Sequence, residues 1–241
     1  KGSFSFRNIP AGSYAVEAYT EAHTLAATTV NVVEGQTSSF DLSLQPTAPY
    51  LELYASQHVF SPSQKASLQA RGFATESALT VSVYEVKFES IAKKRGLYQV
   101  LSPLTYENPQ VDPDRSPDFT RVKQTTWPIK NRNDEGIFDE YVTLEGLPEG
   151  IYWVRTQAGA RQRGTWVMIS KIALVTKSTL GATYAFVTDL ETGKPVTGAT
   201  MRYAQGEALV PAGTTGADGT LKFQQPARVG DDVDRNNAVV A

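Results

Sequence analysis

Residues 146–154, with the sequence GLPEGIYWV, decide the fold class because their pattern occurs again at residues 8–16, NIPAGSYAV. Each stretch has proline, glycine, tyrosine and valine at alternate positions. Proline fixes φ at a bend, and glycine adopts backbone shapes that other residues resist. A tyrosine that follows such a bend often donates its hydroxyl to nearby backbone, as in the tyrosine corner of Greek-key sandwiches. The repeat therefore predicts two strands that each leave a sandwich corner, with Tyr14 and Val16, or Tyr152 and Val154, on one face.

The composition agrees with a chain of many short strands. Of the 241 residues, 41% are hydrophobic and 20% are charged, which suffices for packed cores and argues against disorder. The 18 glycines and 13 prolines are scattered singly, as is typical of strands joined by turns. The length suits two full modules, or one full and two partial ones. We therefore predict an all-β fold, a tandem array of antiparallel β-sandwich domains of the immunoglobulin or fibronectin-III type.

A second repeat sets the expected domain boundaries. The turn and strand at residues 217–223, ADGTLKF, have the same form as residues 2–6, GSFSF, which lead into the first corner. We therefore expect the chain to begin near the last strands of one module and to end before the last strands of another. The predicted domains are residues 1–47, 48–170 and 171–241, the last being truncated, with QPTAP at 45–49 as a linker.

Alternating or β-branched residues predict the individual strands. These strands are residues 4–8, 13–20, 27–33, 38–44, 50–54, 65–71, 79–86, 141–144, 150–157, 165–169, 172–177, 183–188, 200–204 and 220–223. The pattern weakens between Glu89 and Trp127, where residues 90–98 are expected to form a short helix. Residues 108–118 contain three prolines and are expected to form a long irregular loop, a common kind of contact surface.

Several classes of function are disfavoured by what the chain carries. It has no cysteine, which excludes disulfides, thiol nucleophiles and cysteine-ligated zinc. The net charge is −2, and the one basic cluster, Lys93-Lys94-Arg95, is too small for a nucleic-acid or anionic-lipid surface. No apolar stretch approaches the length of a transmembrane helix. We expect neither nucleic-acid binding nor direct membrane insertion.

No group of residues predicts an active site, a cofactor site or a metal site. His23 and His58 fall in different predicted modules, so a histidine-based triad or metal site is disfavoured. Two acidic loops, at residues 112–114 and 231–234, offer oxygen ligands for Ca²⁺, but solvated loops are the favoured interpretation. Residues 189–196, DLETGKPV, lack the paired glycines of a phosphate-binding loop and are expected to form a hairpin turn.

The three tryptophans are the candidates for sugar stacking, namely Trp127, Trp153 and Trp166. Trp166 lies in the apolar run WVMI at 166–169 and is expected in a core strand. Trp153 falls on the face opposite Tyr152, so it is expected either to be exposed or to meet a neighbouring module. Packing in a core or a domain interface is favoured over sugar binding.

The third predicted module resembles a macroglobulin domain of the bacterial α2-macroglobulins. The resemblance rests on IALVTK at 172–177, YAFVTDLETGKPVTGA at 184–199 and TGADG at 215–219. The middle module is similar in its opening strand YLEL at 50–53, in FSPSQ at 60–64 and in its closing corner at 147–152. Serine and glutamine stand at 63–64 where the family usually has glycine and glutamate. Residues 1–47 resemble instead a carboxypeptidase-regulatory-like or Cna-B-type β-sandwich.

The resemblance implies a non-catalytic scaffold fragment of a bacterial α2-macroglobulin-like envelope protein that traps proteases. In many members a bait segment is cut and a thioester then captures the protease. That thioester requires a cysteine, which this chain lacks, and no bait region is recognisable. The implied partners are other domains of the same full-length protein and proteases. The implied location is extracellular or periplasmic, with any signal or anchor outside these residues. The alternative hypothesis is a surface adhesin or carbohydrate-binding array of immunoglobulin-like domains.

Overall fold

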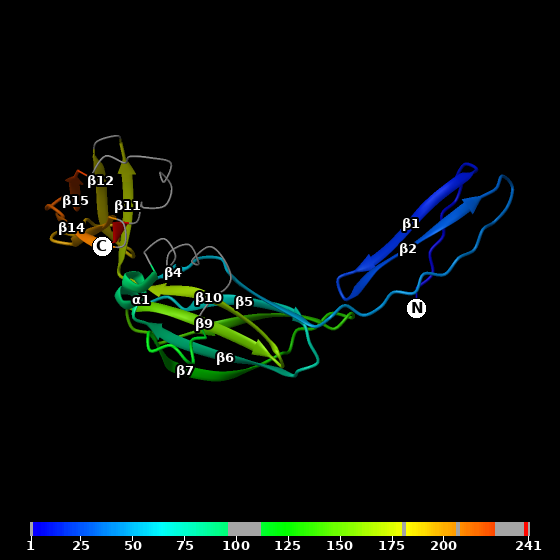
Figure 1. The fold of residues 1–241 in the computed structure, drawn as a ribbon, viewed down its shortest axis with the longest axis horizontal. Coiled ribbons are helices and arrows are strands. Elements are labelled where there is room, and N and C mark those ends of the chain that lie inside the picture. Colours follow the sequence, from blue (N-terminus) through cyan, green and yellow to red (C-terminus); the bar gives the residue numbers. More distant parts are fainter. Residues whose placement is uncertain (1, 96–111, 180–181, 206–207, 225–238, 241) are drawn as a thin grey trace.

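The computed structural model describes residues 2–95, 112–179, 182–205, 208–224 and 239–240. Within these ranges the chain forms sixteen strands and one helix, arranged in five sheets (Figure 1). The first sheet is a hairpin of β1 (Gly12–Thr20) and β2 (His23–Val32), which extends away from the central sheets (Figure 1). The predicted all-β class is confirmed.

Two sheets from the middle of the chain form a central sandwich (Figure 1). The five-stranded sheet has the order β4 (Val59–Phe60), β10 (Arg161–Ile169), β9 (Gly150–Ala158), β6 (Ala78–Val86) and β7 (Phe119–Pro128). The three-stranded sheet has the order β3 (Tyr50–Ala55), β5 (Ala66–Phe73) and β8 (Ile137–Leu144). All pairings in the two sheets are antiparallel except that of the short β4 with β10, which is parallel.

The core between these two sheets follows the alternation of the sequence. In β5 the residues alternate strictly between buried and half-buried, so that Leu68 and Ala70 point inward and Gln69 and Arg71 point outward. The facing sheet contributes Val81 and further apolar side chains. The buried cluster comprises Leu51, Leu53, Phe60, Ala66, Leu68, Ala70, Ala74, Leu79, Val81, Val83, Phe138, Val142, Leu144, Tyr152, Val154, Ala158, Val167 and Ile169.

The outer face of the five-stranded sheet carries a second cluster, beside helix α1 (Phe88–Arg95). The buried members of this cluster are Tyr84, Val86, Ile91, Phe119, Trp153 and Trp166, with Phe88 and Ile151 packed against them. Trp153 and Trp166 are paired across β9 and β10, and their rings meet edge to face at 5.2 Å. The expected helix is therefore present over residues 88–95, while the rest of its predicted span lies outside the described residues. Around β6, β9 and β10 this sheet is therefore covered on both faces.

Two further three-stranded sheets follow the sandwich. One has the order β11 (Ile172–Ser178), β12 (Thr183–Asp189) and β15 (Thr220–Phe223). The other has the order β14 (Ala208–Thr214), β13 (Thr200–Gln205) and β16 (Val239–Val240). Ala185, Val187, Met201, Tyr203 and Phe223 form their common buried cluster, in which the rings of Tyr203 and Phe223 stack at 5.5 Å.

Two predicted strands are absent from the structure, and four observed strands, β4, β7, β14 and β16, were not predicted. Residues 4–8 and 38–44 alternate in sequence but form no strand, because no ladder partner lies beside them. Strand β7 was not predicted because most of its residues are exposed on both faces, so hydrophobic alternation is absent. Strand β14 was also not predicted, and it pairs with β13 through a register shift at Met201.

Both predicted tyrosine corners are present. The hydroxyl of Tyr152 donates to the carbonyl of Pro148 at 2.9 Å, and that of Tyr14 donates to Pro10 at 3.0 Å. The glycines at the bends, Gly12 and Gly150, do not have positive φ, contrary to the reason for which glycine was expected there.

The glycine at each bend instead lies against the tyrosine side chain: a Cβ would stand 3.3 Å from the Tyr152 hydroxyl oxygen at Gly150 and 3.4 Å from the Tyr14 ring at Gly12. Positive φ occurs four residues earlier, at Gly146 (71°) and at Asn8 (59°). Asn8 is the one non-glycine residue in the described ranges with positive φ, a conformation that asparagine tolerates better than most residues. The two corners thus share their backbone shape as well as their sequence.

Candidate functional site

The two histidines have separate structural roles. The Nδ1 atom of His23 lies 2.9 Å from the hydroxyl of Thr20, within the turn of the β1–β2 hairpin. The Nδ1 atom of His58 lies 2.9 Å from the carbonyl oxygen of Trp166, which is part of the seam between β4 and β10. The structure does not bring the two imidazoles together into one site.

The acidic loop at residues 112–114 is bound to the sandwich by side-chain contacts. Asp114 accepts hydrogen bonds from the Tyr84 hydroxyl at 2.8 Å and from Arg155 Nη2 at 2.6 Å. Burial opposes the ionisation of Asp114, but these two bonds keep its pKa below the usual value. The carboxylate is thus used to hold the segment against β6 and β9. Of the loop predicted at 108–118, residues 108–111 lie outside the described ranges.

Of the other loops considered, the structure describes residues 189–196 and does not describe residues 231–234. In the described ranges, no three histidine or acidic side chains gather where they could hold a metal ion. The acidic loop at 231–234 and the side chains at 93–95 lie outside what the structure describes. Residues 189–196 form the expected hairpin turn, in which Asp189 Oδ1 accepts from the backbone and the hydroxyl of Thr192, both at 2.7 Å, and Gly193 has positive φ. No helix in the described ranges is long and apolar enough to cross a membrane.

The tryptophans offer little surface for sugar stacking. Trp153 and Trp166 are 2% and 3% exposed, and Trp127 is partly buried against the main core. The expectation that Trp153 is either exposed or in contact with another module is wrong, because the aromatic cluster beside α1 covers its face of the sheet. The packing predicted for Trp166 is confirmed.

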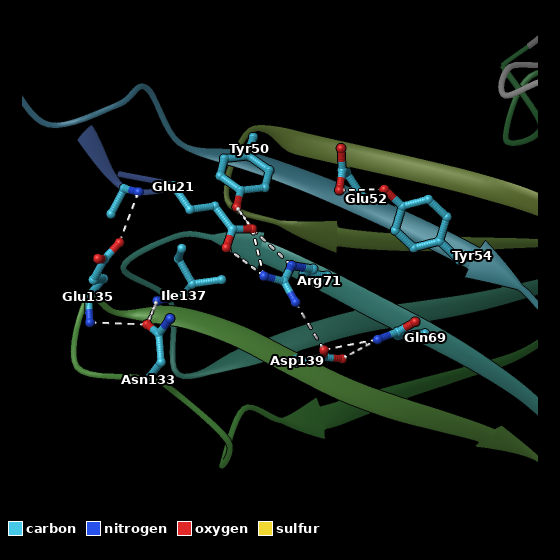
Figure 2. A network of polar contacts seen from close by, with 11 residues as sticks. Glu21, Tyr50, Glu52, Tyr54, Gln69, Arg71, Asn133, Glu135, Ile137 and Asp139 are labelled. Carbon is cyan, nitrogen blue, oxygen red and sulfur yellow. Dashed lines mark hydrogen bonds and ion pairs between the residues drawn. The ribbon is translucent and has the colours of Figure 1, made fainter. Parts of the chain in front are cut away.

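The polar groups that do converge lie where the hairpin meets the sandwich, and we define this contact as the joint. Glu21 and Ala22 form the turn between β1 and β2 (Figure 2). Ala22 is 1% exposed, and its backbone N–H lies 3.3 Å from the Oε2 atom of Glu135. Asn133 orients the Glu135 segment by accepting from the backbone N–H groups of Glu135 and Ile137. The β1–β2 turn therefore contacts the segment that connects β7 with β8.

Arg71 of β5 is the centre of the joint (Figure 2). Its Nε and Nη2 atoms donate to Oε1 of Glu21 at 2.9 and 2.7 Å, and Nη2 also lies 2.5 Å from Oε2. The Tyr50 hydroxyl donates to the same Oε1 at 3.1 Å. On its other side, Arg71 Nη1 lies 3.3 Å from Asp139 of β8. One guanidinium therefore connects the hairpin with two strands of the sandwich.

The pKa shifts at the joint follow from this geometry. The hydrogen bonds from Arg71 lower the pKa of the Glu21 carboxyl, against a smaller opposing effect of burial. Burial, followed by the bond to Glu21, raises the pKa of Tyr50 to about 12. Bonding to Glu21 raises the pKa of Arg71 further above its usual value. At neutral pH the joint is an ion pair with a neutral phenol as an additional donor.

The C-terminal sheets also make polar contacts with the sandwich. Lys171 lies 2.7 Å from Glu149 of the second corner, and Arg202 of β13 lies 2.8 Å from Glu89 of α1. Glu191, in the turn after β12, accepts a hydrogen bond from the Ser63 hydroxyl. Both ends of the central sandwich are therefore contacted by charged side chains of the neighbouring sheets.

Sequence reasoning did not identify the joint. Glu21 and Arg71 are 50 residues apart, and neither belongs to a motif. The outward direction of Arg71 follows from its place in the alternation of β5, but its partner depends on how two sheets from different parts of the chain meet. Local sequence carries no signal for such a contact.

Comparison with known proteins gives one similarity in sequence and several in structure. No family model matches the chain. An α2-macroglobulin of Ralstonia nicotianae is 27% identical over 146 residues, which cover 54% of this chain and 9% of that protein. A crystal structure of native α2-macroglobulin from Escherichia coli, spanning domains named NIE and MG1, has a TM-score of 0.55 at 16% identity. The matched region covers 79% of this chain and 96% of the chain in that crystal structure.

A second crystal structure from the same Escherichia coli protein, spanning domains MG0, NIE and MG1, has a TM-score of 0.54 at 15% identity. It covers 90% of this chain and 67% of the other. At these identities the structural likeness concerns the fold alone. The sequence similarity covers about half of the chain and a small part of a much longer relative, so it connects the chain with bacterial α2-macroglobulin at the level of domains.

Proposed function

We propose that this chain is a non-catalytic scaffold segment of a bacterial α2-macroglobulin-like envelope protein that takes part in trapping proteases. The observation that carries the proposal is the 27% identity to the Ralstonia protein. In this proposal residues 1–47, 48–170 and 171–241 are successive modules, the first of the carboxypeptidase-regulatory-like type and the others macroglobulin-like. Their partners are further domains of the same protein and the proteases that it encloses.

The contacts between the sheets support a mechanical role. Several ionisable groups in the described ranges pair at boundaries, as at Glu21–Arg71 and Glu149–Lys171, and Asp114–Arg155 fixes a loop. These groups are paired with each other, and their geometry serves to hold segments in place. Polar contacts of this kind are typical of the boundaries between modules of one chain.

The carbohydrate-binding alternative is weakened because two of its three candidate residues, Trp153 and Trp166, are buried. Stacking of a sugar ring requires an accessible aromatic face, and Trp153 and Trp166 are packed beside α1. No other observation in the described part of the chain favours a glycan over a protein partner.

The test uses the full-length protein that contains this chain. After incubation with an endopeptidase, a trap leaves cleavage of a small peptide substrate intact and suppresses cleavage of a large protein substrate. We expect this pattern for the full-length protein and no inhibition by the 241-residue chain alone. Equal cleavage of both substrates in the presence of the full-length protein would contradict the proposal, as would inhibition by the isolated chain.

A further inference from the structure

Arg71 is oriented by the sandwich itself, independently of the hairpin. Its Nη1 atom faces Asp139, and Asp139 is held in turn by Gln69 Nε2, which lies 2.8 and 2.9 Å from the two carboxylate oxygens (Figure 2). Gln69 and Arg71 belong to β5 and Asp139 to the adjacent β8, so the three side chains share one face of one sheet. The guanidinium is therefore directed outward by groups that remain in place if Glu21 leaves.

The side of Arg71 that faces the hairpin matches a carboxylate. Nε and Nη2 form the planar edge of the guanidinium that binds both oxygens of a carboxylate at once. Both oxygens of Glu21 are engaged there, at distances between 2.5 and 2.9 Å. The Tyr50 hydroxyl, from β3, provides a third donor to the same carboxylate. Two strands of the sandwich thus present three donors to one anionic group.

The contact is polar and accessible, which makes it reversible. The side chains of Arg71 and Glu21 are 35% and 45% exposed. Ala22 is the one buried apolar residue in the described part of the chain before Tyr50, so little hydrophobic burial fixes the hairpin to the sandwich. Exposed ion pairs of this kind contribute little to stability, so the joint can open without unfolding either the hairpin or the sandwich.

We propose that Arg71 and Tyr50 form a preorganised carboxylate-binding site on the central sandwich, with Glu21 as its detachable occupant. The hairpin is then latched to the sandwich, and an acidic side chain of another polypeptide segment takes the place of Glu21 when the latch opens. This inference concerns residues of the described chain alone and does not depend on the envelope-protein proposal.

The first experiment measures whether Glu21 closes the latch. Because the chain has no cysteine, the substitutions Thr29→Cys on the hairpin and Thr126→Cys on β7 allow two spin labels to be attached at exposed positions. We expect a narrow distance distribution for the wild-type background and a broad one after Glu21→Gln. Glu17→Gln is the matched control, since it removes the same charge from an exposed position of the same hairpin. A distribution left unchanged by Glu21→Gln would overturn the latch.

The second experiment tests carboxylate binding by Arg71 in the Glu21→Gln variant, in which the Glu21 carboxylate is absent. The probe is a peptide with the sequence of residues 19–24, YTEAHT, and its control carries glutamine at the third position. We expect the Arg71 Nε–H signal in an NMR spectrum to shift with the acidic peptide, in the millimolar range, and not with the control. Equal shifts with both peptides, or none with either, would overturn the carboxylate site.

A further substitution separates binding geometry from charge. Arg71→Lys keeps the positive charge but loses the bidentate fork, so the hairpin of this variant should show a broader distance distribution than wild type. Its folding is checked by the amide spectrum of the sandwich strands, which should be preserved. A distribution as narrow as that of wild type would mean that charge alone closes the latch and would contradict the preorganised site.

Discussion

The two tyrosine corners share one sequence pattern and one backbone shape, yet they lie in very different surroundings. Tyr152 is 1% exposed and belongs to the main core, whereas Tyr14 is 37% exposed on the face of an isolated hairpin. Their hydroxyl bonds to proline carbonyls have nearly the same length, 2.9 and 3.0 Å. The motif therefore determines the local bend, while burial depends on whether a second sheet packs against the strand.

Comparing the two corners separates the stability contributed by the local motif from the stability contributed by burial of the tyrosine. In the second corner, the ring of Tyr152 fills space between two sheets and its hydroxyl bond is shielded from water. In the first corner, water competes for the same bond and the ring removes little surface from solvent. Paired substitutions at the two corners should therefore have unequal effects, and local amide hydrogen exchange can follow each strand separately.

The largest difference in stability between the two corners is expected when the tyrosine ring is removed. Tyr152→Ala should lower the free energy of unfolding of the sandwich by about 3–5 kcal/mol, because it leaves a cavity among packed side chains. Tyr14→Ala should cost less than about 1 kcal/mol. Hydrogen exchange of the β9 and β1 amides measures the two effects. Similar losses at both corners would mean that the motif itself, and not its burial, supplies the stability.

Substitution of the glycine at each bend should give a second, smaller difference in stability between the two corners. Gly150→Val places a branched side chain where its Cβ would lie 3.3 Å from the Tyr152 hydroxyl oxygen, in a position where the ring cannot move away. We expect a loss of about 1–3 kcal/mol, as for other overpacked sites. Gly12→Val should cost less than about 0.5 kcal/mol, because the exposed ring of Tyr14 can shift. Thermal unfolding of the two variants, compared with wild type, checks this order.

Removal of the hydroxyl alone isolates the hydrogen bond. Tyr152→Phe should cost about 1 kcal/mol, since it leaves the carbonyl of Pro148 without its partner inside the sandwich. Tyr14→Phe should change stability by no more than a few tenths of a kcal/mol, because water replaces the lost donor. Denaturant titration of both variants measures the difference. A larger loss from Tyr14→Phe would show that the first corner is shielded in solution.

The smallest effect on stability is expected when acid breaks the joint between the hairpin and the sandwich. The pKa of Glu21 is lowered, so its contact with Arg71 is fully present above pH about 4.5 and is lost as the pH falls through the lowered value. Arg71 stays charged over this range, Tyr50 stays neutral, and Asp139 and Glu135 are the nearby carboxylates.

Carboxyl NMR titration should place the midpoint of Glu21 below the ordinary value of a glutamate side chain. A Glu21 midpoint at or above that ordinary value would show that the contact does not persist in solution. Arg71→Lys serves as the control, since weakening the bonds to Glu21 should move the Glu21 midpoint back toward its ordinary value.

Most strands of the sandwich could be predicted because at least one face of each is buried, whereas the largely exposed β7 was missed. Alternation in β5 and the pattern after the second corner both identify the inward residues correctly. The same reasoning failed for residues 38–44, where Phe40 and Leu42 alternate with polar residues but no strand forms. Alternation indicates that a segment has an apolar face, and it does not indicate that a ladder partner is available.

The candidate site was less predictable for two physical reasons. The burial of Trp153 depends on a helix inserted between β6 and β7, which alternation along β9 cannot reveal. The pairing of Glu21 with Arg71 depends on tertiary contact between separate sheets. By contrast, the turn at residues 189–196 was predicted, because its side-chain bonds are formed within a few residues of each other.

The tryptophans beside α1 have a practical consequence for following this protein in solution. Trp153 and Trp166 touch edge to face, Trp127 packs on the same sandwich, and residues 1–47 and 171–241 have no tryptophan. Tryptophan fluorescence, excited at wavelengths where tyrosine does not absorb, therefore reports on the middle portion of the chain alone. A change in the aromatic cluster should alter the indole signal, whereas movement of the hairpin should leave it unchanged. The two events can therefore be distinguished without a dye.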